Sequence, residues 1–251
     1  MIRWTEEAGM IVRRWGEGPE LVWIHGLGES STSFDPIARA MPGFTHVLPD
    51  LPGYGRSMWP DAPVTLEALA AHLAGWLKAP ARIVGHSMGG VLAVLLAELG
   101  AAAAIVNVDG NISIGDCNFS GAAAAYSPAD FAAHGFAALR DKVYRDGVAD
   151  APLRGYAAAM HFAAPHVFHG HALDLVRLSS GQSLAGRIAA LRTPALYVAG
   201  VPRGICEASR ALLTSAGVPW VGLSPAGHWV YLDQLAAFAD LVSRFFGMLP
   251  A

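Results

Sequence analysis

The chain has 251 residues, of which 53% are hydrophobic and only 15% charged, and its formal net charge at pH 7 is −3. This composition is typical of one large globular domain and excludes a disordered chain. No basic stripe is present, so binding to nucleic acid is not expected. The two cysteines, Cys117 and Cys206, lie far apart and have no metal or disulfide spacing.

Apolar and β-branched runs predict eight strands, and from residue 21 onward these alternate with helices. We expect strands at 2–6, 10–15, 21–24, 45–48, 81–85, 105–108, 195–198 and 219–223. We expect the main helices at 34–41, 65–77, 91–99, 206–215 and 228–246, with Thr65 as an N-cap. The first two strands form a hairpin at one edge. The alternation predicts an α/β fold with a mostly parallel, doubly wound sheet.

The region from 88 to 108 is almost wholly apolar and is long enough to imitate a membrane span. Glu98 and Gly100 interrupt it, and it ends in a strand-like run. We therefore interpret it as a buried helix, an Ala-rich connection and a buried parallel strand. No membrane span is expected.

The alternation breaks between residues 111 and 187, a stretch rich in Ala, aromatic residues and His. Prolines divide it into several short helices. Because a long insertion at the carboxyl edge of a sheet would cover the cleft there, we expect 111–187 to be a helical cap on a core made of 1–110 and 188–251.

The stretch Gly85-His86-Ser87-Met88-Gly89 has a strand pattern before it and a helical pattern after it. This context is typical of a nucleophile elbow, a tight turn that holds a serine in a strained conformation at the end of a strand. Gly85 and Gly89 leave room for the turn. The amide of Met88, at the start of the helix, faces the same space.

Four motifs together resemble the α/β-hydrolase superfamily over nearly the whole chain. They are Gly85-His86-Ser87-Met88-Gly89-Gly90, His25-Gly26-Leu27-Gly28, Asp50-Leu51-Pro52-Gly53-Tyr54-Gly55-Arg56-Ser57 and Ala226-Gly227-His228. The resemblance implies an eight-stranded α/β-hydrolase fold with Ser87 as nucleophile and His228 as its base. It also implies an oxyanion hole made by the backbone amides of Leu27 and Met88, with Gly26 permitting close approach. His25 and His86 are expected to support the loop and the elbow.

The sequence departs from the commonest family pattern at the acid that orients the histidine. No carboxylate follows the strand at 195–198, where Arg203 stands about where Asp is expected. Asp109, after the strand at 105–108, is the best substitute, since some superfamily members carry the acid there. Asp116 and Glu207 are the alternatives. Asp50 and Asp233 are expected to have structural roles.

Four histidines, at 161, 166, 169 and 171, lie within eleven residues. No cysteine or paired carboxylate accompanies them, so no metal site and no cofactor are expected. The aromatic side chains of this region are expected to line an apolar substrate pocket.

These features predict a serine hydrolase that cleaves carboxylic ester or related acyl bonds of an apolar small molecule. The alternatives are hydrolysis of a C–C bond or a lactone by the same residues, and a non-catalytic ligand-binding homologue. A serine at the elbow argues against epoxide hydrolases and haloalkane dehalogenases, which use Asp there. The N-terminus, Met1-Ile2-Arg3-Trp4-Thr5, does not read as a signal peptide, so a cytoplasmic location is expected. The sequence makes no prediction of oligomeric state.

Overall fold

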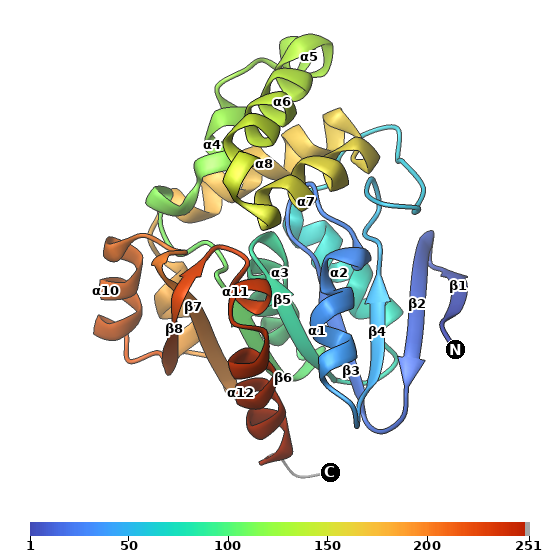
Figure 1. Ribbon diagram of the computed structural model, residues 1–251, viewed down its shortest axis with the longest axis vertical. Coiled ribbons are helices and arrows are strands. Elements are labelled where there is room, and N and C mark those ends of the chain that lie inside the picture. The colour runs from blue at the N-terminus through green and yellow to red at the C-terminus, as the bar shows by residue number, and fades with distance from the viewer. Residues whose placement is uncertain (249–251) are drawn as a thin grey trace.

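The computed structural model describes residues 1–248. One eight-stranded sheet runs through it, in the order β1-β2-β4-β3-β5-β6-β7-β8 (Figure 1). The strands are β1 (Arg3–Glu7), β2 (Met10–Gly16), β3 (Glu20–Ile24), β4 (Thr45–Pro49), β5 (Ala81–His86), β6 (Ala102–Val108), β7 (Ala195–Arg203) and β8 (Trp220–Gly227). β2 is antiparallel to β1 and β4, and all other pairs are parallel. The predicted α/β class and mostly parallel sheet are confirmed.

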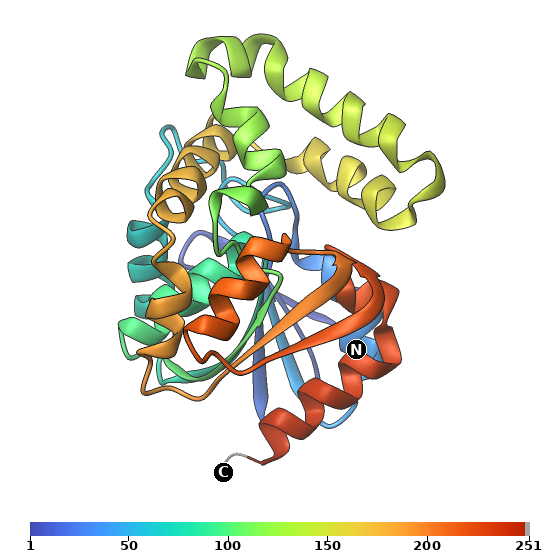
Figure 2. The same ribbon diagram turned by 90° about the vertical axis from the view of Figure 1, so that its left-hand side faces the viewer.

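Helices cover both faces of the sheet (Figure 2). One face carries α1 (Asp35–Ala40), α11 (Val230–Asp233) and α12 (Leu235–Gly247). The other carries α2 (Leu66–Trp76), α3 (Met88–Glu98), α9 (Leu184–Ala189) and α10 (Glu207–Ser215). The side chain of Thr65 accepts a hydrogen bond from the amide of Ala68 at 3.1 Å, so Thr65 caps α2 as predicted.

From Ile114 to Ser180, the segment between β6 and α9 is helical and lies above one end of the sheet (Figures 1 and 2). It contains η2 (Ile114–Asp116), α4 (Asn118–Ala124), α5 (Pro128–Asp130), the π-helix η3 (Phe131–Gly135), α6 (Phe136–Asp146), η4 (Gly147–Ala149), α7 (Ala151–Ala159), η5 (Met160–Phe162) and α8 (Pro165–Ser180). The main chain of this segment is hydrogen-bonded to the loop after β4, because the amide of Ala164 donates to the carbonyl of Gly53 at 2.8 Å.

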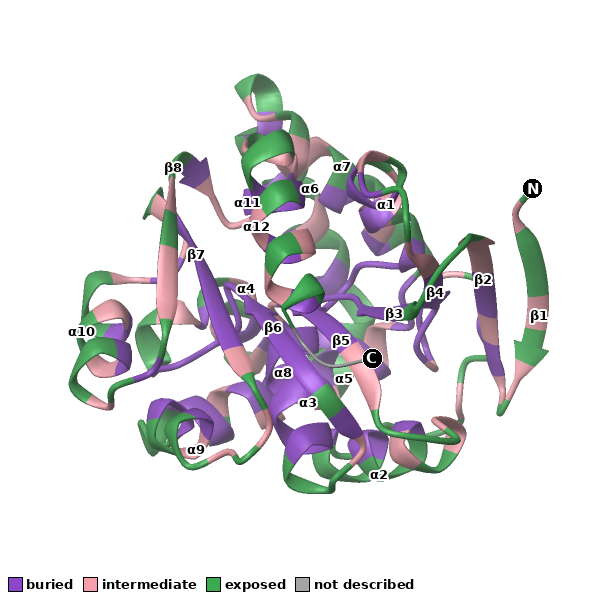
Figure 3. Ribbon diagram, turned by 90° about the horizontal axis from the view of Figure 1, so that it is seen from below, coloured by how far each residue is buried: buried purple, intermediate pink, exposed green. Residues whose placement is uncertain are grey.

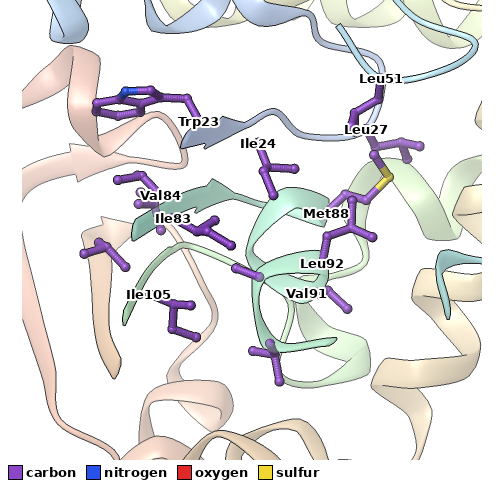
Figure 4. Close-up of a cluster of buried hydrophobic side chains, with 14 of the residues drawn as sticks. Trp23, Ile24, Leu27, Leu51, Ile83, Val84, Met88, Val91, Leu92 and Ile105 are labelled. Carbon is purple, nitrogen blue, oxygen red and sulfur yellow. The ribbon is translucent and has the colours of Figure 1, made fainter. Parts of the chain in front are cut away.

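The core lies between the central strands and the helices on either side. Figure 3 shows the middle strands and α3 as almost continuously buried. In Figure 4, side chains from β3, β5, β6, α3 and the loops after β3 and β4 form one cluster, with these residues labelled: Trp23, Ile24, Leu27, Leu51, Ile83, Val84, Met88, Val91, Leu92 and Ile105. Because both faces of β5 are covered, its consecutive residues Ile83 and Val84 are both apolar and buried.

Several predicted boundaries are wrong. The Ala-rich connection forms the start of β6, because Ala102 and Ala104 pair with β5. Residues 224–227, beyond the predicted end of the strand at 219–223, continue β8 alongside β7. The single final helix is two helices, since Gln234 has φ −125° and ψ 48° between α11 and α12. The helix expected at 34–41 begins with a 3-10 turn, η1 (Ser31–Phe34). No described helix has the length and apolar character needed to cross a membrane.

Candidate active site

Ser87 lies between the end of β5 and the first residue of α3. Its backbone has φ 54° and ψ −118°, a strained conformation for a residue with a side chain. A Cβ on Gly85 would lie 2.0 Å from the carbonyl oxygen of Gly89, and one on Gly89 would lie 2.0 Å from that of Ile24. The turn is therefore possible only with glycine at both positions.

The loop after β3 lies directly against the elbow. A Cβ on Gly26 would be 3.1 Å from the Cβ of Ser87, so the loop backbone passes close to the serine. Leu27 and Met88 follow Gly26 and Ser87 in the chain, and neither backbone amide donates a hydrogen bond to any residue that the structure describes. The amide of Met88 lies at the N-terminus of α3, where the helix dipole favours negative charge.

His228 follows β8, and Asp109 follows β6 at the same end of the sheet. The Nδ1 atom of His228 and the Oδ2 atom of Asp109 are 3.5 Å apart. This distance is long for a hydrogen bond, and Oδ2 has no other partner among the described residues. Asp109 is buried, whereas the side chain of His228 is 25% exposed. The unpaired oxygen of a buried carboxylate thus faces the ring of His228.

The stretch after β7 surrounds Asp109. Its Oδ1 atom accepts from the amides of Gly200 at 3.1 Å and Ile205 at 3.4 Å. A Cβ on Gly204 would lie 2.3 Å from Oδ2 and 2.7 Å from Oδ1. The space beside residue 204 is therefore filled by the carboxylate of Asp109.

The other candidate acids have local partners or lie away from His228. Both oxygens of Asp116 are bonded, to the amides of Ile112, Ser113 and Cys206 and to the hydroxyl of Ser209. Glu207 is exposed at the first turn of α10.

The remaining two carboxylates, Asp50 and Asp233, accept hydrogen bonds from backbone amides. Asp50 accepts from the amides of Ser31 at 2.7 Å and Arg56 at 2.9 Å, which ties its own loop. Asp233 accepts from the amide of Gly227 at 2.7 Å, immediately before His228.

Sequence reasoning missed one carboxylate, Glu29, which is only 2% exposed. It accepts from the amide of Gly26 at 2.8 Å, from the Nε1 atom of Trp229 at 2.5 Å, and from Nδ1 of His86 at 3.0 Å. The Nε2 atom of His86 is 2.9 Å from the carbonyl oxygen of His228. The only signal in the sequence was its position three residues after Gly26, beside the predicted oxyanion loop.

His25 joins the loop after β3 to the loop after β4. Its Nε2 atom accepts from the amide of Leu51 at 3.0 Å, so Nδ1 carries the proton and donates to the carbonyl of Gly26 at 2.9 Å. Burial lowers the pKa of His25, which agrees with this neutral tautomer.

The four histidines of the helical segment have separate partners. His166 contacts the carbonyl of Pro60 at 2.7 Å, His169 that of Tyr126 at 3.0 Å, and His171 the hydroxyl of Tyr54 at 2.8 Å. His161 lies beside Arg140. Residues 1–248 contain no group of three or more His, Cys, Asp or Glu side chains arranged to hold a metal ion.

A cavity of about 260 Å³ opens at Ser87 and His228. Its wall combines the loop after β3 with side chains of the helical segment, among them Phe119, Tyr156 and Leu175. The hydroxyl of Tyr156 is buried and has no hydrogen-bond partner among the described residues. Arg203 and Asp116 also line the cavity, so its surface is mixed in polarity.

The profile of the Alpha/beta hydrolase family matches residues 21–241 of this chain. The chain belongs to this family. The match runs from β3 to α12 and includes the elbow, the loop after β3, Asp109 and His228.

Curated relatives of this α/β hydrolase match over shorter segments. Lipase LipV of Mycobacterium tuberculosis is 39% identical over 92 residues, covering 34% of this chain and 35% of that protein. The pimeloyl-[acyl-carrier protein] methyl ester esterase of Aeromonas hydrophila is 36% identical over 88 residues, covering 34% of this chain and 35% of that protein. The matched segments of the first relatives thus span 4% to 35% of their lengths.

Solved structures match over the whole length. The enol-lactonase of Burkholderia xenovorans LB400 has a TM-score of 0.77 and 21% identity, covering 98% of this chain and 100% of that chain. At this identity the likeness shows the shared fold.

Proposed function

We propose that this α/β hydrolase is a serine hydrolase that cleaves carboxylic ester or related acyl bonds. Ser87 is the nucleophile, His228 the general base and Asp109 the group that orients His228. The amides of Leu27 and Met88 form the oxyanion hole. The observation that carries the proposal is the buried, otherwise unpaired Oδ2 of Asp109, which faces Nδ1 of His228 at the mouth of the cavity that exposes Ser87.

The reaction follows from these positions. Ser87 Oγ attacks the substrate carbonyl while Nε2 of His228 takes its proton, and the two amides stabilise the oxyanion. His228 then protonates the leaving alcohol, and an acyl-enzyme remains. Water, deprotonated by His228, attacks the acyl group and frees the acid and Ser87. No step requires a metal or a cofactor.

The hydroxyl of Ser87 makes no hydrogen bond to a described residue, and Oδ2 of Asp109 stands 3.5 Å from Nδ1 of His228. Catalytic hydrogen bonds are often long in the free enzyme and shorten when substrate binds. Side chains of the proposed cap, residues 111–187, line the cavity at Ser87, among them Phe119, Tyr156 and Leu175. The cavity of about 260 Å³ favours an acyl group of small to medium size.

Labelling with a fluorophosphonate tests the nucleophile directly. We expect the wild-type protein to be labelled and Ser87→Ala to remain unlabelled. Ser113→Ala is a matched control on another buried serine, one that bonds to Ser209 at 2.7 Å, and it should be labelled normally. Absence of labelling in the folded wild-type protein would refute the proposal and favour a non-catalytic ligand-binding protein.

A substrate panel separates the chemistries that one Ser-His-Asp site can perform. It contains esters of increasing acyl length, lactones and vinylogous diketones, each assayed with Ser87→Ala as control. We expect the highest kcat/KM on short-chain esters. A preference of more than about a hundredfold, roughly 2.7 kcal/mol in transition-state binding, for diketones or lactones would assign the C–C bond or lactone reaction instead.

A further inference from the structure

We propose that Glu29 and His86 form a buried ion pair that positions the oxyanion loop, the elbow and the His228 loop as one unit. The protonation of His86 does not depend on the reaction that the protein catalyses. The expected effect of the pair on kcat rests on the proposed function. Both residues are positioning residues, since neither is assigned a contact with the substrate.

The charge follows from what the two ring nitrogens of His86 face. Nε2 is 2.9 Å from the carbonyl oxygen of His228, and a carbonyl oxygen can only accept. Nδ1 is 3.0 Å from Oε2 of Glu29. A neutral imidazole has one N–H, so one of its nitrogens would present a lone pair to an oxygen. An imidazolium donates to both.

The alternative places the shared proton on Glu29, and the surroundings of that carboxylate oppose it. Oε2 also accepts from the amide of Gly26, and Oε1 accepts from the indole of Trp229. Hydrogen bonds donated to a carboxylate stabilise its ionised form. Because each carboxylate oxygen of Glu29 already accepts from a donor other than His86, the shared proton belongs on His86.

The electrostatic environment of His86 agrees with this assignment. Burial opposes the charge, but the facing Glu29 carboxylate raises the pKa of His86 above its ordinary value. Asp109 acts in the same direction, while His25 is neutral. The remaining neighbours are rings: His228 at 4.7 Å, Tyr231 at 5.1 Å and Trp229 at 6.1 Å between centroids.

Burial also opposes ionisation of Glu29. The charge of His86 and the hydrogen bonds from His86, Trp229 and Gly26 outweigh it and lower the pKa of Glu29 to about 2. The shifts of both pKa values thus favour opposite charges on the two groups, whose side chains are only 2% and 1% exposed.

The bonds of this pair reach all three parts of the site. Glu29 fixes the amide of Gly26 before Leu27, and it fixes the indole of Trp229 after His228. His86 precedes Ser87 and fixes the carbonyl of His228. Because a misplacement of about 1 Å can cost a hundredfold in rate, a common anchor for these segments would act on kcat.

The Glu29→Gln variant tests the pair. Glutamine keeps the shape of the side chain, but it does not carry the charge that keeps a second proton on His86. We expect kcat to fall about 10- to 100-fold while KM changes less than about threefold. Glu98→Gln is the matched control, because Glu98 pairs with Arg187 at the far end of α3, with side chains 34% and 28% exposed. It should leave kcat unchanged.

Proton and nitrogen NMR of the histidine side chains in the full-length protein provides the deciding measurement. At pH 6.5 we expect His86 to carry two ring protons in the wild type and one in Glu29→Gln, with His86→Gln assigning the signal. A single ring proton on wild-type His86 would overturn the inference, as would a folded Glu29→Gln variant with unchanged kcat. If wild-type labelling by fluorophosphonate failed, the proposed function would fall while the NMR result still decided the ion pair.

Discussion

Substituting Gly204 by alanine should disable the site by displacing one carboxylate. The added Cβ would lie 2.3 Å from Oδ2 of Asp109, 2.7 Å from its Oδ1 and 2.5 Å from the carbonyl oxygen of Gly200. Such distances do not occur between non-bonded atoms, so the carboxylate or the loop must move. Overpacking of this kind typically lowers the free energy of unfolding by about 1–3 kcal/mol.

The effect on activity follows from what Asp109 would lose. Moving the carboxylate breaks its bonds to the amides of Gly200 and Ile205 and withdraws it from His228. A shift of about 1 Å lowers the rate on the order of a hundredfold. We expect kcat for an ester substrate to fall by that factor, measured at a temperature where thermal unfolding shows the variant to be folded.

Two further variants make this prediction specific. Gly186→Ala, within α9, meets nothing within 4 Å of its Cβ and should leave kcat unchanged while gaining about 0.5–1 kcal/mol in helix stability. In an Asp109→Asn background, Gly204→Ala should add little further loss, because both changes act through the same contact. A folded Gly204→Ala protein with wild-type kcat, or losses that multiply in the double variant, would refute the reasoning.

Three other predictions concern the acid, buried hydroxyls and pH. Asp109→Asn should lower kcat by roughly 10³–10⁴, measured by steady-state kinetics with Asp116→Asn as control; a loss below tenfold would exclude Asp109. Tyr156→Phe should leave the free energy of unfolding unchanged or raise it by up to about 1 kcal/mol, since the hydroxyl of Tyr156 has no partner among the described residues. Tyr197→Phe should lower it by about 1 kcal/mol, because it removes a hydroxyl that donates to the carbonyl of Gly110 at 2.5 Å. The reverse order in urea titrations would contradict this. The Glu29–His86 pair lowers one pKa from 4.5 to about 2 and raises the other above 6.5. Its stabilisation should therefore be complete between about pH 4.5 and 6.5, decline as pH falls toward 2 and decline as pH rises through the raised pKa of His86. Urea titrations across pH should show a flatter dependence for Glu29→Gln, and an equally steep one would count against the pair.

Several features of this fold follow from the local sequence alone. The tight turn at Ser87 requires glycine at 85 and 89 because any side chain there would strike the backbone, so the spacing of these glycines predicts the elbow. The capping of α2 by Thr65 and the buried strand before Ser87 are also local features. Predicted strand boundaries were wrong where strand pairing outweighed the intrinsic preference of a residue. Alanine favours helix, but Ala102 and Ala104 form strand because they pair with β5.

Only the tertiary structure decided which polar groups face one another. Asp109 was a candidate from its place after a strand, but its unpaired oxygen and the absence of room beside Gly204 appear only when β6, β7 and β8 lie side by side. Glu29 and His86 are 57 residues apart, and Trp229 is 200 residues from Glu29. Because these three side chains are buried together, the charge of each depends on the hydrogen bonds and charges of the others. Hydrophobic patterns of period two or 3.6 predict strands and helices, but they do not predict which distant residues pair. The sequence by itself thus determined the turn that presents Ser87, and the folded arrangement decided what holds its partners in place.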